Sequence, residues 1–185
     1  MNERIRAKKA ILEDEQMMQT IEDLSSAISL TISHGGKILI CGNGGSASDS
    51  LHMAGEIVGR FQKERSGWPA VALNADVATM TAIANDYGYD RVFERQTEAL
   101  MTSKDLLIGI STSGNSENVY KAILKAQEIG GKTAALTGKD GGKIAKVADY
   151  SLVARSHVTA RVQESHITII HILCELMEND LAKAD

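Results

Sequence analysis

The chain has 185 residues, of which 43% are hydrophobic and 24% charged, a composition typical of a globular domain with a sizeable core. Its formal net charge of −4 and its pI of about 5.7 argue against a general nucleic-acid-binding surface, which needs a basic face. Two cysteines make no disulfide framework, no apolar run reaches the ~20 residues that span a bilayer, and the first residues lack a signal-peptide core, so we expect a cytoplasmic protein.

The first 34 residues are predicted to be helical. Ile21, Leu24, Ile28 and Ile32 recur at helical spacing within residues 3–33, with one possible break, and two glycines follow His34. Beyond them, short apolar runs alternate with helical patterns. The predicted strands are 37–41, 70–74, 106–111, 133–137 and 150–154, and the predicted helices are 46–63, 76–84, 91–101, 117–129, 143–147 and 159–181.

Alternating strands and helices predict an α/β fold in which a five-stranded parallel sheet is the middle layer of an α/β/α sandwich. We expect a single domain over residues 1–185, with a helical segment at 1–34, the sheet core at 37–155 and a last helix at 159–182. The last helix is apolar nearly all round, and the first precedes every strand. We therefore expect both terminal helices to take part in a homo-oligomer that buries their surplus apolar surface.

Two loops rich in glycine and serine each follow a predicted strand and precede a helix. They read Gly42-Asn-Gly-Gly-Ser-Ala47 and Ser111-Thr-Ser-Gly-Asn-Ser116. Free backbone N–H groups and the helix dipole favour an anion at such turns, and ligands bind at the carboxyl ends of parallel strands. Two such turns suggest a small phosphorylated ligand, although the second could be a plain polar turn in which Ser116 caps the helix.

The first loop loosely matches the G-x-G-x-x-A dinucleotide pattern, but the following strand ends in Asn74 instead of an acid, and the spacing is too long. No Lys-Ser or Lys-Thr pair closes the loop, so it is not a P-loop either. We therefore expect no nucleotide cofactor.

His52 and Glu56 are four residues apart on one predicted helix and share a face. They could be an exposed polar pair, an active-site pair or two metal ligands. His171 lies in an apolar run, where a histidine is either a core residue or an acid/base group. Gln163 and His171 lie about 12 Å apart along one straight helix, so both can serve one small centre only if the helix bends or two subunits contribute. We expect a site between subunits, with His171 or Gln163 of one chain meeting His52 and Glu56 of another.

These motifs together resemble the phosphoheptose isomerases, a family with the sugar-isomerase (SIS) fold, which is flavodoxin-like. The resemblance covers essentially the whole chain. It is carried by Cys41-Gly-Asn-Gly-Gly-Ser46, His52-x-x-x-Glu56, Ala84-Asn-Asp-Tyr-Gly88, Gly109-Ile-Ser-Thr-Ser-Gly-Asn-Ser116, Leu136-Thr-Gly-Lys-Asp-Gly-Gly142 and Ala160-Arg-Val-Gln-Glu164 through His171.

The resemblance implies a homotetrameric isomerase that converts sedoheptulose 7-phosphate to D-glycero-D-manno-heptose 7-phosphate, the first step towards heptose for lipopolysaccharide or other surface glycans. Glu56 and His171 would be the acid/base pair. One Zn²⁺ per subunit would be held by His52, Glu56, Gln163 and His171. The substrate-binding residues by motif are Asn43, Gly44, Gly45, Glu56, Asn85, Asp86, Ser111, Thr112, Ser113, Ser116 and Gln163, with the four hydroxyl residues holding the phosphate.

Two positions depart from the family pattern: Val158 stands where an acid is common, and Met53 where an aromatic residue is common. An alternative is a non-catalytic tetrameric relative that binds the bacterial replication initiator. That relative lacks the acid/base residues, whereas Glu56 and His171 are both present here. A sugar-phosphate-sensing regulator would need a DNA-binding domain, for which the acidic segment before Lys37 is too short. We expect an enzyme with a sugar-phosphate substrate and no nucleic-acid or membrane partner.

Overall fold

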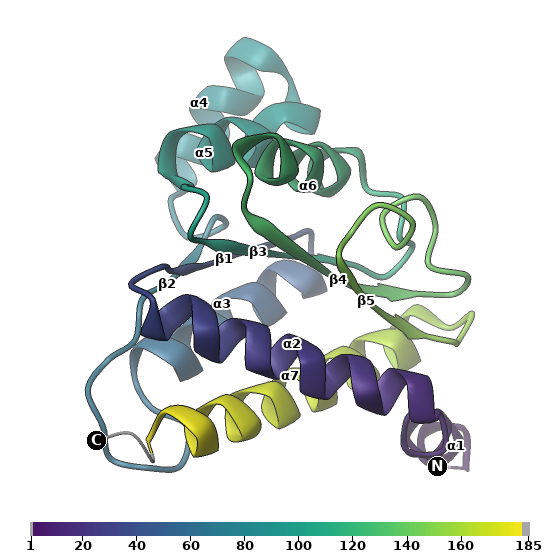
Figure 1. Ribbon diagram of the computed structural model, residues 1–185. Coiled ribbons are helices and arrows are strands. Elements are labelled where there is room, and N and C mark those ends of the chain that lie inside the picture. Colours follow the sequence, from purple (N-terminus) through teal and green to yellow (C-terminus); the bar gives the residue numbers. More distant parts are fainter. Residues whose placement is uncertain (1, 183–185) are drawn as a thin grey trace.

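Five parallel strands form the centre of the molecule in the computed structural model, which describes residues 2–182 (Figure 1). They are β1 (Ile38–Gly42), β2 (Ala70–Ala72), β3 (Leu106–Ser111), β4 (Lys132–Gly138) and β5 (Tyr150–Ala154). The predicted parallel sheet is confirmed, and each strand lies within two residues of its predicted bounds. Residue 1 and residues 183–185, at the ends of the predicted domain, lie outside the described residues.

The strand order is β2-β1-β3-β4-β5, so the chain moves outward from β1 to β2 and then returns to place β3 on the other side of β1. Gly42 at the end of β1 pairs with Ile110 near the end of β3. Sheets with this order bind ligands where the order reverses, outside the carboxyl ends of the two central strands. The two glycine- and serine-rich loops leave the sheet at that point.

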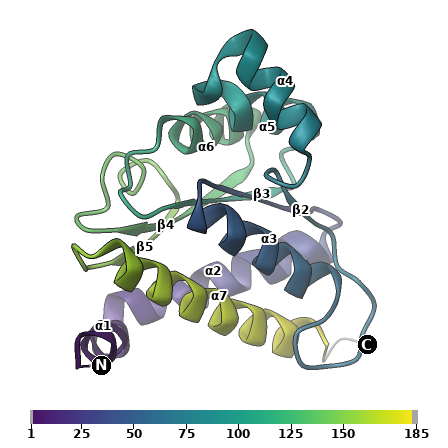
Figure 2. The same cartoon turned by 180° about the vertical axis from the view of Figure 1, so that it is seen from behind.

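Helices cover both faces of the sheet, which confirms the predicted three-layer architecture (Figures 1 and 2). In chain order they are α1 (Asn2–Leu12), α2 (Glu15–Ser33), α3 (Gly45–Val58), α4 (Val77–Tyr87), the 3-10 helix η1 (Tyr89–Arg91), α5 (Val92–Leu100), α6 (Glu117–Ile129) and α7 (Thr159–Leu181). Alternate strand residues enter opposite cores: Ile38 and Ile40 pack with α2, α3 and α7, whereas Leu39 and Cys41 pack with α5 and α6.

The predicted break in the N-terminal helix is present between α1 and α2. Asp14 is the N-cap of α2, and its Oδ1 accepts the backbone N–H of Met17 at 3.0 Å. This bond satisfies one of the donors that a helix start leaves unpaired, so a new helix begins there.

Two predicted helices differ in the structure. The helix predicted over 46–63 ends at Val58, because the N–H groups of residues 61–63 donate to the carboxylate of Glu178 on α7 instead of to carbonyls of a preceding turn. The helix predicted over 143–147 is a series of turns, since the N–H of Ile144 donates to the carbonyl of Gly114 in another loop. Both differences arise from partners distant in the sequence.

The last helix, α7, packs against α1, α2, α3 and the sheet of its own chain, and between residues 161 and 179 only Glu175 is exposed. Three apolar side chains on it, Ile167, Ile172 and Leu176, are half-buried within the chain. Large exposed apolar side chains lie elsewhere, and they include Leu12, Leu30, Leu51, Val58 and Val77.

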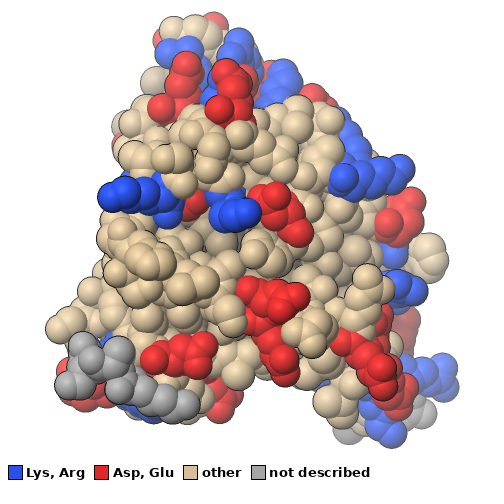
Figure 3. Space-filling view, viewed as in Figure 1, with Lys and Arg blue, Asp and Glu red and all other residues tan. Residues whose placement is uncertain are grey.

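On the face drawn in Figure 3, groups of Lys and Arg side chains are separated by acidic and uncharged areas. This distribution agrees with the low pI and offers no continuous basic field on that face. Among the described residues, no helix is both long and apolar enough to cross a membrane.

Candidate active site

The first loop carries the chain from β1 into α3. Gly44 is the N-cap residue of α3 with φ +56°, a conformation that favours glycine. At Gly45 a Cβ atom would lie only 2.0 Å from Nε2 of Gln163, so the side chain of Gln163 rests directly on the start of α3. The N-terminus of α3 and the first turn of α7 therefore meet at the carboxyl edge of the sheet.

Asn43 connects this loop to two other elements. Its side-chain amide and that of Asn118 on α6 exchange two hydrogen bonds, of 2.8 and 2.9 Å. The hydroxyl of Tyr89 in η1 donates to Oδ1 of Asn43 at 2.9 Å. Sequence reasoning missed Asn118 and Tyr89, because their partner lies 75 and 46 positions away and no local pattern marks the pairing.

The second loop gathers three serine hydroxyls between β3 and α6. Oγ of Ser111 lies 2.9 Å from Oγ of Ser116 and 3.5 Å from Oγ of Ser113. Ser116 occupies the N-cap position of α6 without a capping bond from its side chain, so its hydroxyl faces the other serines instead. Hydroxyls and backbone N–H groups at a helix start are a neutral donor set for a phosphate.

Asn85 and Asp86 lie on the last turn of α4, and both are exposed. Nδ2 of Asn85 donates to Oδ1 of Asp86 at 2.9 Å. Within residues 2–182, no hydrogen bond joins the side chain of Asn85 or Asp86 to any predicted site residue outside this pair. Tyr89, shortly after them, is the contact through which this segment reaches the first loop.

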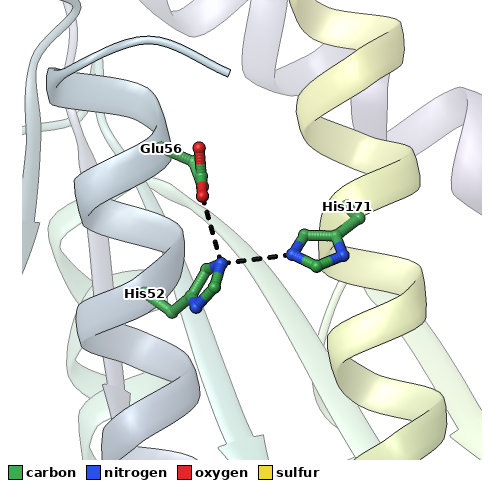
Figure 4. A group of neighbouring side chains, drawn as sticks. All are labelled: His52, Glu56 and His171. Atoms are coloured by element: carbon green, nitrogen blue, oxygen red, sulfur yellow. Dashed lines mark hydrogen bonds and ion pairs between the residues drawn. The ribbon is translucent and has the colours of Figure 1, made fainter. Parts of the chain in front are cut away.

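A second group of side chains lies farther along α3 and α7 (Figure 4). Nε2 of His52 is 3.1 Å from Oε1 of Glu56 and 3.1 Å from Nε2 of His171. His52 is exposed, and the other two are half-buried. The predicted face shared by His52 and Glu56 is present, and His171 turns toward it from the neighbouring helix.

The three side chains fit a small metal ion. One ligand atom from each lies within 4.8 Å of the others. Zinc binds imidazole and carboxylate in tetrahedral geometry with bonds of about 2.0–2.2 Å, which places neighbouring ligand atoms about 3.3 Å apart. The two observed separations of 3.1 Å are close to that value. We therefore name this set, His52, Glu56 and His171, the three-ligand cluster.

Of the two residues that we expected to provide the contact from a neighbouring chain, His171 or Gln163, His171 already meets His52 within one chain. Gln163, predicted with these residues, is not part of the cluster: it lies against Gly45, eight residues before His171 and about 12 Å away along α7. The helix α7 is continuous from Thr159 to Leu181, so no break brings Gln163 closer.

Sequence reasoning also missed Asp49, which lies on α3 one turn before His52. Its Oδ2 is buried without a hydrogen-bond partner among the described residues. Burial raises the pKa of its carboxyl to about 6, although the nearby His52 lowers it. The spacing of Asp49, His52 and Glu56, at i, i+3 and i+7, is the signal that could have found it.

The chain is similar to known proteins in both sequence and structure. The SIS domain family matches residues 3–138. The phosphoheptose isomerase of Aliarcobacter butzleri is 51% identical over 168 residues, which cover 91% of this chain and 89% of that protein. That of Aquifex aeolicus is 50% identical over 164 residues, covering 89% and 86%. The structure of the phosphoheptose isomerase from Neisseria gonorrhoeae superposes with a TM-score of 0.91 at 42% identity and covers 96% of this chain and 94% of that one.

Proposed function

Because the chain belongs to the SIS domain family and, within it, to the phosphoheptose isomerases, we propose that it converts sedoheptulose 7-phosphate to D-glycero-D-manno-heptose 7-phosphate. The observation that carries this proposal is the convergence of Glu56 and His171 on His52 from two different helices. An isomerase that moves a proton between neighbouring carbons needs a carboxylate base and a second acid/base group for the oxygens. The cluster supplies both.

The reaction follows from these groups. Glu56 takes the proton from the first carbon of the ketose, which gives an enediol, and returns it to the second carbon. His171 moves a proton between the two oxygens, so that the carbonyl passes from the second carbon to the first. The serine hydroxyls of the second loop, with Thr112, hold the phosphate through neutral donors, while Asn43, Gly44, Gly45, Asn85 and Asp86 bind the remainder of the sugar.

We assign the three-ligand cluster to Zn²⁺, with Gln163 of a neighbouring subunit as a further ligand. The donor set of two imidazoles and one carboxylate suits zinc, and it leaves room for a fourth ligand. Zinc bound there would polarise the carbonyl of the substrate. Oε1 of Glu56 and Nε2 of His171 both face His52, so Oε2 of Glu56 and Nδ1 of His171 are the atoms left for proton transfer.

We infer that the complete site forms between the subunits of a homotetramer. Glu56 lies eleven residues beyond Gly45, which is about 16 Å along the axis of α3. An extended chain gains roughly 3.3–3.6 Å for every three bonds, so the first carbon and the phosphorus of a heptose 7-phosphate are at most roughly 10 Å apart. A phosphate bound at the start of α3 would therefore leave the reacting carbons short of Glu56 in the same chain.

The direct test is formation of the aldose from sedoheptulose 7-phosphate by the purified protein, followed by NMR of the product. Exchange of solvent deuterium into the second carbon would mark the enediol route. Absence of the aldose at micromolar enzyme, with and without added Zn²⁺, would refute the proposal. The initiator-binding alternative gains no support, since both acid/base residues are present and converge.

A further inference from the structure

A fully buried ion pair lies beside the three-ligand cluster, at the end of α3 opposite the glycine loop. Nε of Arg65, in the segment between α3 and β2, is 3.1 Å from Oε1 of Glu178 on α7. Both side chains are only 2% exposed. Burying two charges is costly, and apolar residues of similar size often stabilise a fold equally well. The pair therefore calls for a role beyond stability.

Arg65 closes the C-terminal end of α3, where backbone carbonyls have no partner within the helix. Its Nη2 donates to the carbonyl of Glu56 at 2.9 Å, and its Nη1 donates to the carbonyl of Ile57 at 3.0 Å. The guanidinium also stacks on the ring of Trp68, 3.6 Å from its centroid. A cation at this end suits the helix dipole, and the planar guanidinium fixes the backbone from which the Glu56 side chain projects.

Glu178 orders the other side of the cluster. Its two oxygens accept the N–H groups of Phe61, Gln62 and Lys63 at 3.1, 2.7 and 2.9 Å. Burial raises the pKa of the Glu178 carboxyl. The hydrogen bonds from these N–H groups and from Arg65 lower the pKa by more than burial raises it, so it lies below the ordinary value. The ring of Phe61 stacks near that of His171, with centroids 5.8 Å apart and planes at 32°. One carboxylate thus holds the loop whose aromatic ring borders His171.

We propose that the Arg65–Glu178 pair positions the catalytic groups: it sets the separation of Glu56 and His171 by fixing the end of α3 and the Phe61 loop at once. Neither residue touches the substrate, so both are positioning residues. This inference rests on the proposed isomerase function. A misplacement of about 1 Å in such a site can cost roughly a hundredfold in rate.

The test compares Glu178→Gln and Arg65→Lys with Asp105→Asn. Asp105 is a matched control because it is equally buried and pairs with Lys37, accepting that residue's backbone N–H at 2.8 Å, but its side-chain hydrogen bonds go to Lys37 and Thr102 and not to α3, α7 or the Phe61 loop. Activity is measured well below each melting temperature and divided by the folded fraction from circular dichroism. We expect kcat to fall about tenfold to a hundredfold in the first two variants, with KM within twofold, and both constants to be unchanged in the control.

A spectroscopic measurement separates positioning from mere stability. The aromatic ring of Phe61 should displace the ¹H–¹³C resonances of the nearby His171 ring through its ring current. At a fixed pH, this displacement should disappear in Glu178→Gln, while the resonances of His34, which serve as the reference, should not change. Phe61→Leu leaves the ion pair intact, so it should fold and show a smaller loss of kcat with the same change at His171. If Glu178→Gln does not fold, the Phe61→Leu variant tests the positioning role instead.

Three results would overturn the inference: normal kcat per folded molecule in Phe61→Leu and Arg65→Lys, an unmoved His171 resonance, or an equal loss in Asp105→Asn. Failure of the proposed function looks different. In that case the wild-type protein forms no aldose, while the His171 resonance still reports whether the pair orders the cluster.

Discussion

The imidazoles of His52 and His171 face each other with their Nε2 atoms 3.1 Å apart, although 119 positions separate them in the chain. Their ring centroids are 5.1 Å apart and their planes meet at 53°. Two neutral rings in this arrangement need one donor and one acceptor, whereas a bound cation uses both as acceptors. Substitution of either histidine therefore tests whether the protein binds a metal ion at this position.

Zinc should stabilise the chelator-treated protein through this pair. At a free concentration of 100 times Kd, binding adds about 2.7 kcal/mol. For a chain of this length that corresponds to a rise in Tm of roughly 5–10 °C. His52→Ala should lose the rise, while His157→Gln, at an exposed histidine outside the cluster, should keep it. Equal shifts in both variants, measured by scanning calorimetry, would exclude the cluster as the binding site.

Glu56→Gln should keep the fold and phosphate binding but lose turnover by several orders of magnitude. An amide has the shape of the carboxylate but cannot take a proton from carbon. Turnover is measured by aldose formation, and phosphate binding by calorimetry with an inert sugar phosphate. Near-normal turnover would remove Glu56 from the mechanism.

Ser113→Ala and Ser116→Ala should mainly raise KM. Each removes a hydroxyl from the serine group, and a hydrogen bond to a charged group contributes about 1.5–3 kcal/mol, so affinity should fall roughly tenfold to a hundredfold. Ser156→Ala, a serine after β5, serves as a control. A crystal soaked with sugar phosphate that shows the phosphate away from this loop would contradict the assignment.

Mixing two impaired variants should restore activity if the site lies between subunits. Glu56→Gln lacks the base but keeps the serine loop, and Ser113→Ala/Ser116→Ala has the reverse defect. Tetramers assembled from both, after unfolding and refolding together, contain some sites with an intact loop and an intact base. Refolded single variants are the control. No recovery in verified mixed tetramers would show that one chain supplies both parts.

The buried His166 should make stability depend on pH. Its ring is fully buried, and Nε2 donates to the carbonyl of Thr137 at 2.9 Å. Burial lowers the pKa of His166 from 6.5 to about 4, although the bond to Thr137 raises it. Between these values only the unfolded state takes up the proton, so this residue's contribution to stability falls as the pH falls through the window, by about 3 kcal/mol in total.

His166→Gln removes that titration and keeps an N–H donor. Urea unfolding of both proteins from pH 8 to pH 4 gives the difference between their free energies of unfolding. This difference should change by about 3 kcal/mol in favour of the variant as the pH falls, and it should be constant above pH 7. Parallel curves would show that His166 keeps its ordinary pKa in the folded protein.

The sequence by itself was sufficient to predict the three layers of the fold and the positions of the two glycine- and serine-rich loops. Strand lengths and helix periods are local properties, so the β3 and β5 bounds and the whole of α7 agree with prediction. The strand–loop–helix pattern likewise predicted where Ser111 and Ser116 lie, because parallel strands end at one edge. The i, i+4 spacing of His52 and Glu56 sufficed to place them on one face of α3.

Only the tertiary structure decided which distant groups meet. The parallel packing of α3 and α7 brings His171 to His52 and leaves Gln163 at Gly45, a choice that depends on the register of two helices and not on either one alone. The early end of α3 depends on Glu178, more than a hundred positions away. Periodicity shows which face of a helix is buried, but the partner of a buried polar group is chosen by the packing of the whole chain, because burial without a partner is costly and any element can supply one.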